Sequence, residues 1–262
     1  MATAKKVMIF IVEGPTEETA LAQILSRIFS TSQIKFEIVH GDITTEYRSN
    51  PRERVRDFVL QSLSRNGYRW KDIARIVQIG DTDGAFIPDE DVKESDDGKT
   101  HYGENEIYAG NVDTMRKRNA RKKHAMRELA GISAITYNRT SVPYSLYFFS
   151  RNMEHALHNR SGELSDDEKV QLAQQFRRQY AKNTDEFKKF IASVEVAVNG
   201  DYRETWQRIS EGRPPCTGDR IYICSLPIIR TQIYLLEYEY PRNPHNANCA
   251  DPDIDGGSSG ID

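Results

Sequence analysis

Cysteine is scarce in this sequence, and the few cysteines form no ligand or disulfide pattern. The 262 residues include Cys216, Cys224 and Cys249, an odd number with no C-x-x-C pair. A disulfide framework or a structural zinc site is therefore not expected, and a reducing compartment such as the cytoplasm fits best.

Long hydrophobic runs are also missing. The longest apolar run, Val7–Val12, has 6 residues, whereas a transmembrane helix needs about 20. Glu13 follows that run directly, so it has no small-residue cleavage site of the kind that ends a signal peptide. We expect a soluble cytoplasmic protein with no membrane partner.

Neither sign of charge is in large excess. The 36 Lys and Arg residues against 39 Asp and Glu residues leave a net charge of −3. No global field therefore draws the protein to nucleic acid, and an anionic partner would need a local basic patch. The hydrophobic share of 38% in a chain of this length can build a substantial core, which excludes a disordered or fibrous protein.

What the sequence does contain is an alternation of buried strands and amphipathic helices in its first third. Short β-branched runs followed by turn residues predict strands, and apolar residues at helical spacing predict helices. Alternation of this kind is typical of an α/β fold with a mostly parallel sheet. The expected elements are a strand at Val7–Val12, a helix at Thr16–Ile28 capped by Thr16, a strand at Phe36–Val39, a helix at Arg52–Ser64 and a strand at Ile73–Ile79.

The remaining two thirds predict a loop, a basic helix and a helical region. We expect a loop over 88–114, a helix at Met115–Leu129, a strand at Tyr144–Phe149, a helix at Arg151–His158, helices starting at Ser165 and Thr184 (the latter to about Val198) and a strand at Ile221–Cys224. The expected domains are a catalytic core over 1–159, a helical insertion over 160–215, a return to the core over 216–240 and a flexible tail over 241–262.

Three carboxylates follow the predicted strands. Glu13 comes after the first strand, and Asp81 and Asp83 come after the third. The carboxyl ends of parallel strands lie along one edge of a sheet, so we expect these side chains to meet there. Residues i and i+2 of an extended segment point the same way, which would aim Asp81 and Asp83 at one point. Such an oxygen-rich site suits Mg²⁺ or Mn²⁺, although turn residues after a strand explain each motif alone.

These motifs resemble those of a known family. Val12-Glu13-Gly14-Pro15-Thr16-Glu17 resembles the first motif of the Toprim domain, and Asp81-Thr82-Asp83-Gly84 resembles its Asp-x-Asp motif. The resemblance spans about 6–90 and is strongest to the stand-alone Toprim nucleases of bacterial anti-phage defence, of the OLD and PARIS types. It implies a Toprim-like, mostly parallel sheet flanked by helices, here with a C-terminal helical insertion.

The resemblance also implies roles and partners. Glu13 would be the general acid or base and a metal neighbour, and Asp81 and Asp83 would bind Mg²⁺ or Mn²⁺. Glu154, which follows a later strand at the start of a helix, would join the catalytic residues. The protein would then be a metal-dependent nuclease that hydrolyses RNA, tRNA included, or DNA as a toxin-like defence effector. An ABC-type, OLD-like ATPase is the expected partner, and a homodimer is left open.

A basic stretch supplies a candidate surface for nucleic acid. Positive residues crowd one predicted helix at more than one face, which favours contact with a phosphate backbone. The alternative is a solvated helix whose charges are balanced by the acidic loop at 89–98. The candidate contacts are Arg116, Lys117, Arg118, Arg121, Lys122 and Lys123.

Two other functions compete with the nuclease. A haloacid-dehalogenase-like phosphatase also carries Asp-x-Asp-Gly after a strand, with Asp81 as nucleophile and Asp83 as acid or base, but it leaves Glu13 unexplained. A non-catalytic Toprim module that docks to or senses a partner would not depend on Glu13 at all.

Overall fold

The computed structural model describes residues 6–29, 33–38, 43–45, 50–103, 106–160, 164–193, 196 and 200–211. None of the helices in these ranges is long and apolar enough to cross a membrane. In chain order the elements are β1 (Val7–Val12), α1 (Pro15–Ile28), β2 (Gln33–Ile38), α2 (Pro51–Asn66), β3 (Ile73–Asp81), β4 (Val92–Glu94), β5 (His101–Tyr102), β6 (Ile107–Ala109), α3 (Val112–Ala130), β7 (Ala134–Tyr137), β8 (Thr140–Phe149), α4 (Met153–His158), α5 (Asp166–Tyr180), α6 (Thr184–Ile191) and α7 (Tyr202–Ser210).

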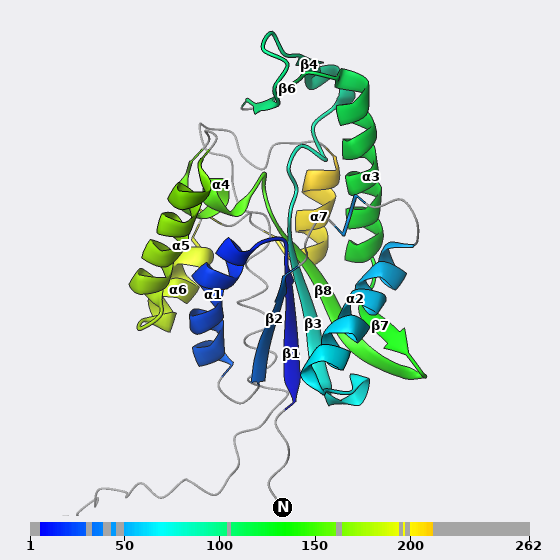
Figure 1. Cartoon of the computed structure of the whole chain (residues 1–262), viewed down its shortest axis with the longest axis vertical. Coiled ribbons are helices and arrows are strands. Elements are labelled where there is room, and N and C mark those ends of the chain that lie inside the picture. The colour runs from blue at the N-terminus through cyan, green and yellow to red at the C-terminus, as the bar shows by residue number, and fades with distance from the viewer. Residues whose placement is uncertain are drawn as a thin grey trace, which may run out of the picture.

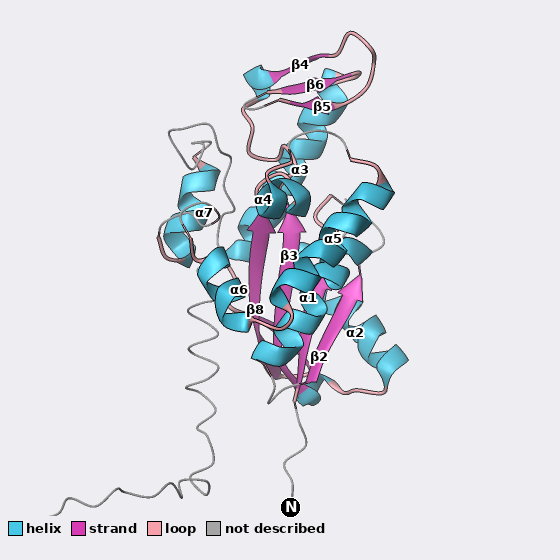
Figure 2. Ribbon diagram, turned by 90° about the vertical axis from the view of Figure 1, so that its left-hand side faces the viewer, coloured by secondary structure: helices cyan, strands magenta, loops and turns pink. Residues whose placement is uncertain are grey.

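The main sheet is mostly parallel, as the alternating pattern predicts. Its strand order is β2-β1-β3-β8-β7. Strands β2, β1, β3 and β8 run parallel, and only β7 pairs antiparallel, as a hairpin with β8. The parallel strands therefore end at a common edge, at the end of the sheet toward α4 and the small second sheet (Figure 2).

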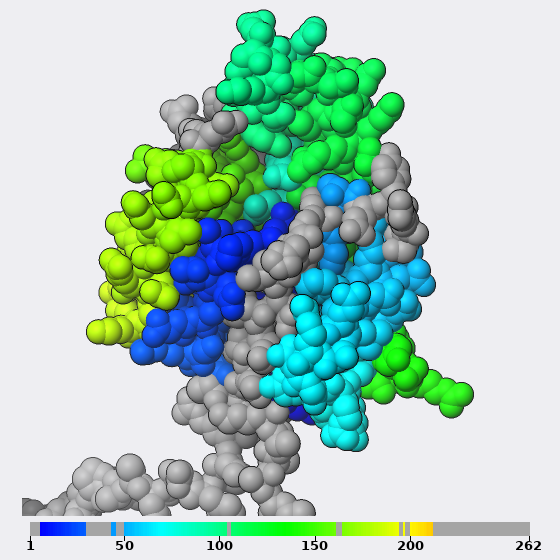
Figure 3. Space-filling view, viewed as in Figure 1, coloured from blue at the N-terminus to red at the C-terminus, as the bar shows by residue number. Residues whose placement is uncertain are grey.

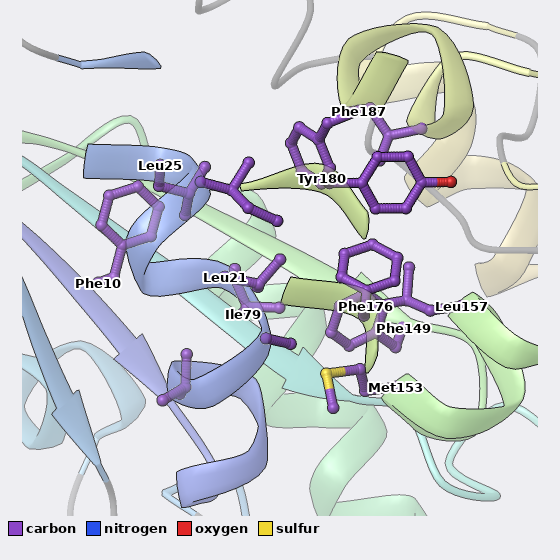
Figure 4. Close-up of a cluster of buried hydrophobic side chains, with 14 of the residues drawn as sticks. Phe10, Leu21, Leu25, Ile79, Phe149, Met153, Leu157, Phe176, Tyr180 and Phe187 are labelled. Atoms are coloured by element: carbon purple, nitrogen blue, oxygen red, sulfur yellow. The ribbon is translucent and has the colours of Figure 1, made fainter. Parts of the chain in front are cut away.

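Helices cover both faces of this sheet. All of β1 is buried, and its alternate residues enter two separate cores because successive side chains of a strand point to opposite faces. One core holds Phe10 among side chains from α1, α4, α5 and α6 (Figure 4). The other holds Ile9 among side chains from α2, α3 and α7. Figures 1 and 3 show α1, α5 and α6 on one flank and α2 on the other.

The predicted loop over 88–114 is wrong in part, because it contains a second sheet with strand order β4-β6-β5. β4 pairs parallel and β5 antiparallel to β6. Each strand has only 2 or 3 residues in an Asp- and Gly-rich segment, so no periodicity could form. We call residues 88–111 the arm, since Figure 1 shows its sheet projecting beyond the end of the main sheet.

Several helix boundaries also differ from prediction. Helix α1 begins at Pro15 with Gly14 as N-cap, not at Thr16, because proline suits the first helical position, where no N–H is needed. Helix α3 starts earlier than expected because the Asn111 side chain accepts the N–H of Thr114 at 2.8 Å. The capping box predicted at Ser165 is confirmed.

The second half of the chain adds helices to both flanks of the sheet. Helix α5 packs on α1, whereas Trp206 of α7 packs against Phe148 on the opposite face. Helix α6 ends at Ile191, short of the predicted Val198. The predicted strand at Ile221–Cys224, the return to the core over 216–240 and the tail over 241–262 lie outside the described residues.

Gly110 fixes how the arm folds back on itself. A Cβ placed on Gly110 would lie 2.2 Å from the carbonyl oxygen of Gly98, and a backbone oxygen cannot swing away. We expect Gly110→Ala to lower the free energy of unfolding by about 1–3 kcal/mol, as overpacking usually does. Urea unfolding would measure it. Gly131→Ala is the control, because its Cβ would meet ordinary contacts at 3.5 Å; equal losses in both variants would contradict the steric explanation.

Candidate active site

Glu13 joins the ends of two neighbouring strands. It follows β1, and its Oε1 accepts the backbone N–H of Asp81, the last residue of β3, at 3.0 Å. A Cβ on Gly80 would lie only 3.0 Å from that same oxygen. The absence of a side chain at Gly80 therefore leaves room for the hydrogen bond between Glu13 and Asp81. The two motifs that lie far apart in sequence therefore meet at the sheet edge, as the parallel topology predicts.

The Asp81-Thr82-Asp83 segment is tied to the end of β8. Thr82 donates its N–H to the Phe149 carbonyl, and Asp83 donates its N–H to the Arg151 carbonyl, both at 2.9 Å. The chain turns at Asp83, whose φ is 46°. The expected extended i, i+2 geometry is thus wrong, because β3 ends at Asp81 and Asp83 adopts the left-handed conformation that Asp tolerates in turns.

Helix α3 brings two cations to Asp83. Oδ2 of Asp83 lies 2.6 Å from an Nη of Arg118 and 2.7 Å from Nζ of Lys122. The same Nζ lies 3.6 Å from Oε1 of Glu13. The Lys122 side chain has no solvent exposure, whereas that of Arg118 is 34% exposed. Lys122 therefore places a buried amino group between Asp83 and Glu13.

Further acids surround Asp81. Burial raises the pKa of Asp81 well above its usual range, and the negative charges of Glu13, Glu17 and Asp83 raise it further. Glu17, in the first turn of α1, and Glu154, in α4, are both buried. Burial raises the pKa of Glu17, and the nearby charge of Glu154 adds to that rise. The structure therefore gathers Glu13, Glu17, Asp81, Asp83 and Glu154 in one region.

The basic residues of α3 have different surroundings. Arg116 donates from Nε to the Asp89 carbonyl at 2.8 Å and so holds the arm. Arg118 and Lys122 turn toward the carboxylates. Lys122, named above as a phosphate contact, is wholly buried there, and we reassign it to the carboxylate cluster. Lys117 is exposed, while Arg121 and Lys123 are half-buried.

No family model, curated protein or solved structure matches the chain.

The residues present fit a hard divalent cation in their chemistry. Among the described residues, no group of three or more His, Cys, Asp or Glu side chains has an arrangement that could hold a metal ion. Glu13 and Asp83 instead face the N–H of Asp81 and the cations of α3. Several carboxylates raise the pKa of the half-buried Asp81. They nevertheless form a set of oxygen donors whose mutual repulsion a cation would relieve.

The raised pKa of Asp81 predicts a pH-dependent stability. Its stabilising contribution is complete below the unfolded-state value of 3.8 and is lost as pH rises through the folded-state pKa, because the folded protein holds a proton that the unfolded chain releases. Urea unfolding in EDTA should show stability falling over that window. Asp81→Asn removes the titrating group, so its curve should be flatter; equal slopes in both proteins would contradict the prediction.

Proposed function

We propose that the protein is a metal-dependent nuclease that hydrolyses phosphodiester bonds in RNA or DNA. The observation that carries the proposal is the meeting of Glu13 with Asp81 at the common edge of two parallel strands. A turn residue that merely ended β1 would not need to bond the neighbouring strand's last residue. Asp83, fastened to β8 through Arg151, completes the group.

Each carboxylate of the cluster would have its own role in catalysis. Asp81 and Asp83 would hold Mg²⁺ or Mn²⁺ with Glu13 beside them, and the ion, when bound, supplies positive charge that stabilises the reacting phosphate. Glu13 is only 24% exposed and would accept or donate the proton of the attacking water or leaving oxygen. Buried Glu17 and Glu154 add negative charge to this donor set. Lys122 offsets part of the negative charge of the cluster through its contacts with Asp83 and Glu13.

A candidate substrate surface lies on α3, the helix that also carries Lys122. Lys117 is exposed on α3, and half-buried Arg121 and Lys123 lie on the same helix. We propose that these side chains contact the phosphate backbone, so binding should weaken as salt rises. The acidic arm next to α3 restricts the directions from which a polyanion can approach.

The position of Glu13 also favours a nuclease over the phosphatase alternative. A phosphatase that uses Asp81 as nucleophile assigns no task to Glu13, the acid that accepts the backbone N–H of Asp81. Trapping a phosphoryl group on Asp81 would support the phosphatase. A docking module would keep its function when Glu13 is replaced.

Cleavage of end-labelled tRNA and plasmid DNA tests the proposal. We expect cleavage of one of them with Mg²⁺ or Mn²⁺ and none with EDTA. Absence of cleavage under every condition, with partner binding intact, would favour the docking module. The proposed defence role and ATPase partner derive from the Toprim resemblance, so an ATPase encoded beside the gene is added as a separate component.

A further inference from the structure

One carboxylate oxygen of Asp83 contacts two cationic side chains, and these side chains differ in their exposure to solvent. Nζ of Lys122 and an Nη of Arg118 both lie within 2.7 Å of Oδ2. Lys122 has no exposure and also faces Glu13 at 3.6 Å. The Arg118 side chain is a third exposed, so part of it already contacts water. It can change partners more easily than Lys122, whose ammonium has no exposure and is held among the carboxylates.

A second guanidinium group shares a neighbour, Tyr102, with Arg118. The Arg151 guanidinium lies over the Tyr102 ring, 5.0 Å from its centroid. Burial raises the pKa of Tyr102, the charge of Asp83 raises it further, and the charges of Arg118 and Lys122 oppose these effects. Tyr102 therefore has the guanidinium groups of both Arg118 and Arg151 nearby. Planar, delocalised guanidinium groups suit bidentate binding of phosphate.

We propose that Arg118 exchanges partners during substrate binding: it pairs with Asp83 when the metal is absent and with a substrate phosphate when Asp83 holds the metal. This inference rests on the proposed metal-dependent nuclease. It assigns Arg118 a specific task that the other basic residues of α3 do not share, because only Arg118 combines a direct bond to a candidate metal ligand with partial exposure.

The exchange makes metal and phosphate binding cooperative. A metal ion at Oδ2 of Asp83 would compete with Arg118 for that oxygen. A bound phosphate would then supply the negative charge that the released Arg118 needs. By linkage, the phosphate must tighten metal binding by the same factor by which the metal tightens phosphate binding. This coupling would keep the occupancy of the metal site low when no substrate is bound.

Binding of Mn²⁺, followed by electron paramagnetic resonance with and without a phosphorothioate oligonucleotide, tests this exchange. In the wild type the oligonucleotide should tighten Mn²⁺ binding roughly tenfold, within the usual range for coupled sites. Arg118→Gln should bind Mn²⁺ more tightly than wild type without oligonucleotide, because the competing cation is gone, and should lose most of the enhancement. Arg118→Lys should retain part of it.

Lys117→Gln is the matched control, because it removes one positive charge from the neighbouring, exposed position of α3. It should weaken oligonucleotide binding yet keep the wild-type Mn²⁺ affinity and enhancement. Mn²⁺ binding that is the same in wild type and Arg118→Gln, with equal enhancement, would overturn the exchange and leave the nuclease proposal standing. No Mn²⁺ binding by the wild type would instead count against the nuclease itself.

Discussion

Replacing Glu13 with glutamine should lower the metal-dependent cleavage rate about 10²–10⁴-fold, the range that a positioned general acid or base supplies. Glutamine keeps an oxygen that can accept the N–H of Asp81, the bond seen at 3.0 Å. It removes the negative charge and the ability to take a proton. The loss should therefore appear in catalysis with little change in folding, which circular dichroism would verify.

Glu18→Gln is the matched control for this experiment. Glu18 stands in the same first turn of α1 as Glu17 but is not among the acids that surround Asp81. Its replacement should leave the cleavage rate within about twofold, since surface changes away from a site have small effects. Equal rates in wild type and Glu13→Gln would remove Glu13 from the mechanism and revive the phosphatase or the docking module.

Replacing Lys122 with methionine should have the largest effect on stability. Methionine keeps the length of the side chain but leaves Asp83 and Glu13 without the buried ammonium that lies 2.7 Å and 3.6 Å from their oxygens. Removing one partner of a buried ion pair usually lowers the free energy of unfolding by about 3–5 kcal/mol. We expect about 3 kcal/mol, because Asp83 is 23% exposed and keeps Arg118.

Urea unfolding in EDTA measures this loss, and adding Mg²⁺ should recover part of it because a cation replaces the missing charge. Lys117→Met, at an exposed position of the same helix, should change the free energy of unfolding by about 0.5 kcal/mol or less. A Lys122→Met protein as stable as the wild type would show that Lys122 does not balance the carboxylates.

The parts of the fold and site that follow from sequence are those with a local signal. The run Val7–Val12 is fully buried and ends abruptly at Glu13, and β3 ends in the same way at Asp81. Two such strands in an alternating α/β pattern are enough to predict that their terminal acids meet. The arm could not be predicted, because strands of two or three residues are stabilised by tertiary contacts and leave no periodic pattern.

The burial of Lys122 has a local signal in the sequence. Lys122 stands four residues before Met126 and seven before Leu129, and all three are buried. That spacing places Lys122 on the inner stripe of the helix, away from a solvent-facing surface. The membership of Glu17 in the site had a weaker signal in the sequence, namely its position in the first helical turn after Pro15. Its closeness to Glu154 depends on how α1 and α4 pack, and no local sequence pattern predicts that packing.

Mn²⁺ binding to the wild type and to Asp81→Asn, measured side by side by electron paramagnetic resonance, tests the metal site most directly. Asp97→Asn serves as the control, because Asp97 is an exposed acid of the arm paired with His101. The carboxylate cluster predicts bound Mn²⁺ in the wild type and in Asp97→Asn, and a loss of tight binding in Asp81→Asn. Equal binding by all three proteins, or no binding by any, would contradict a metal site at this sheet edge.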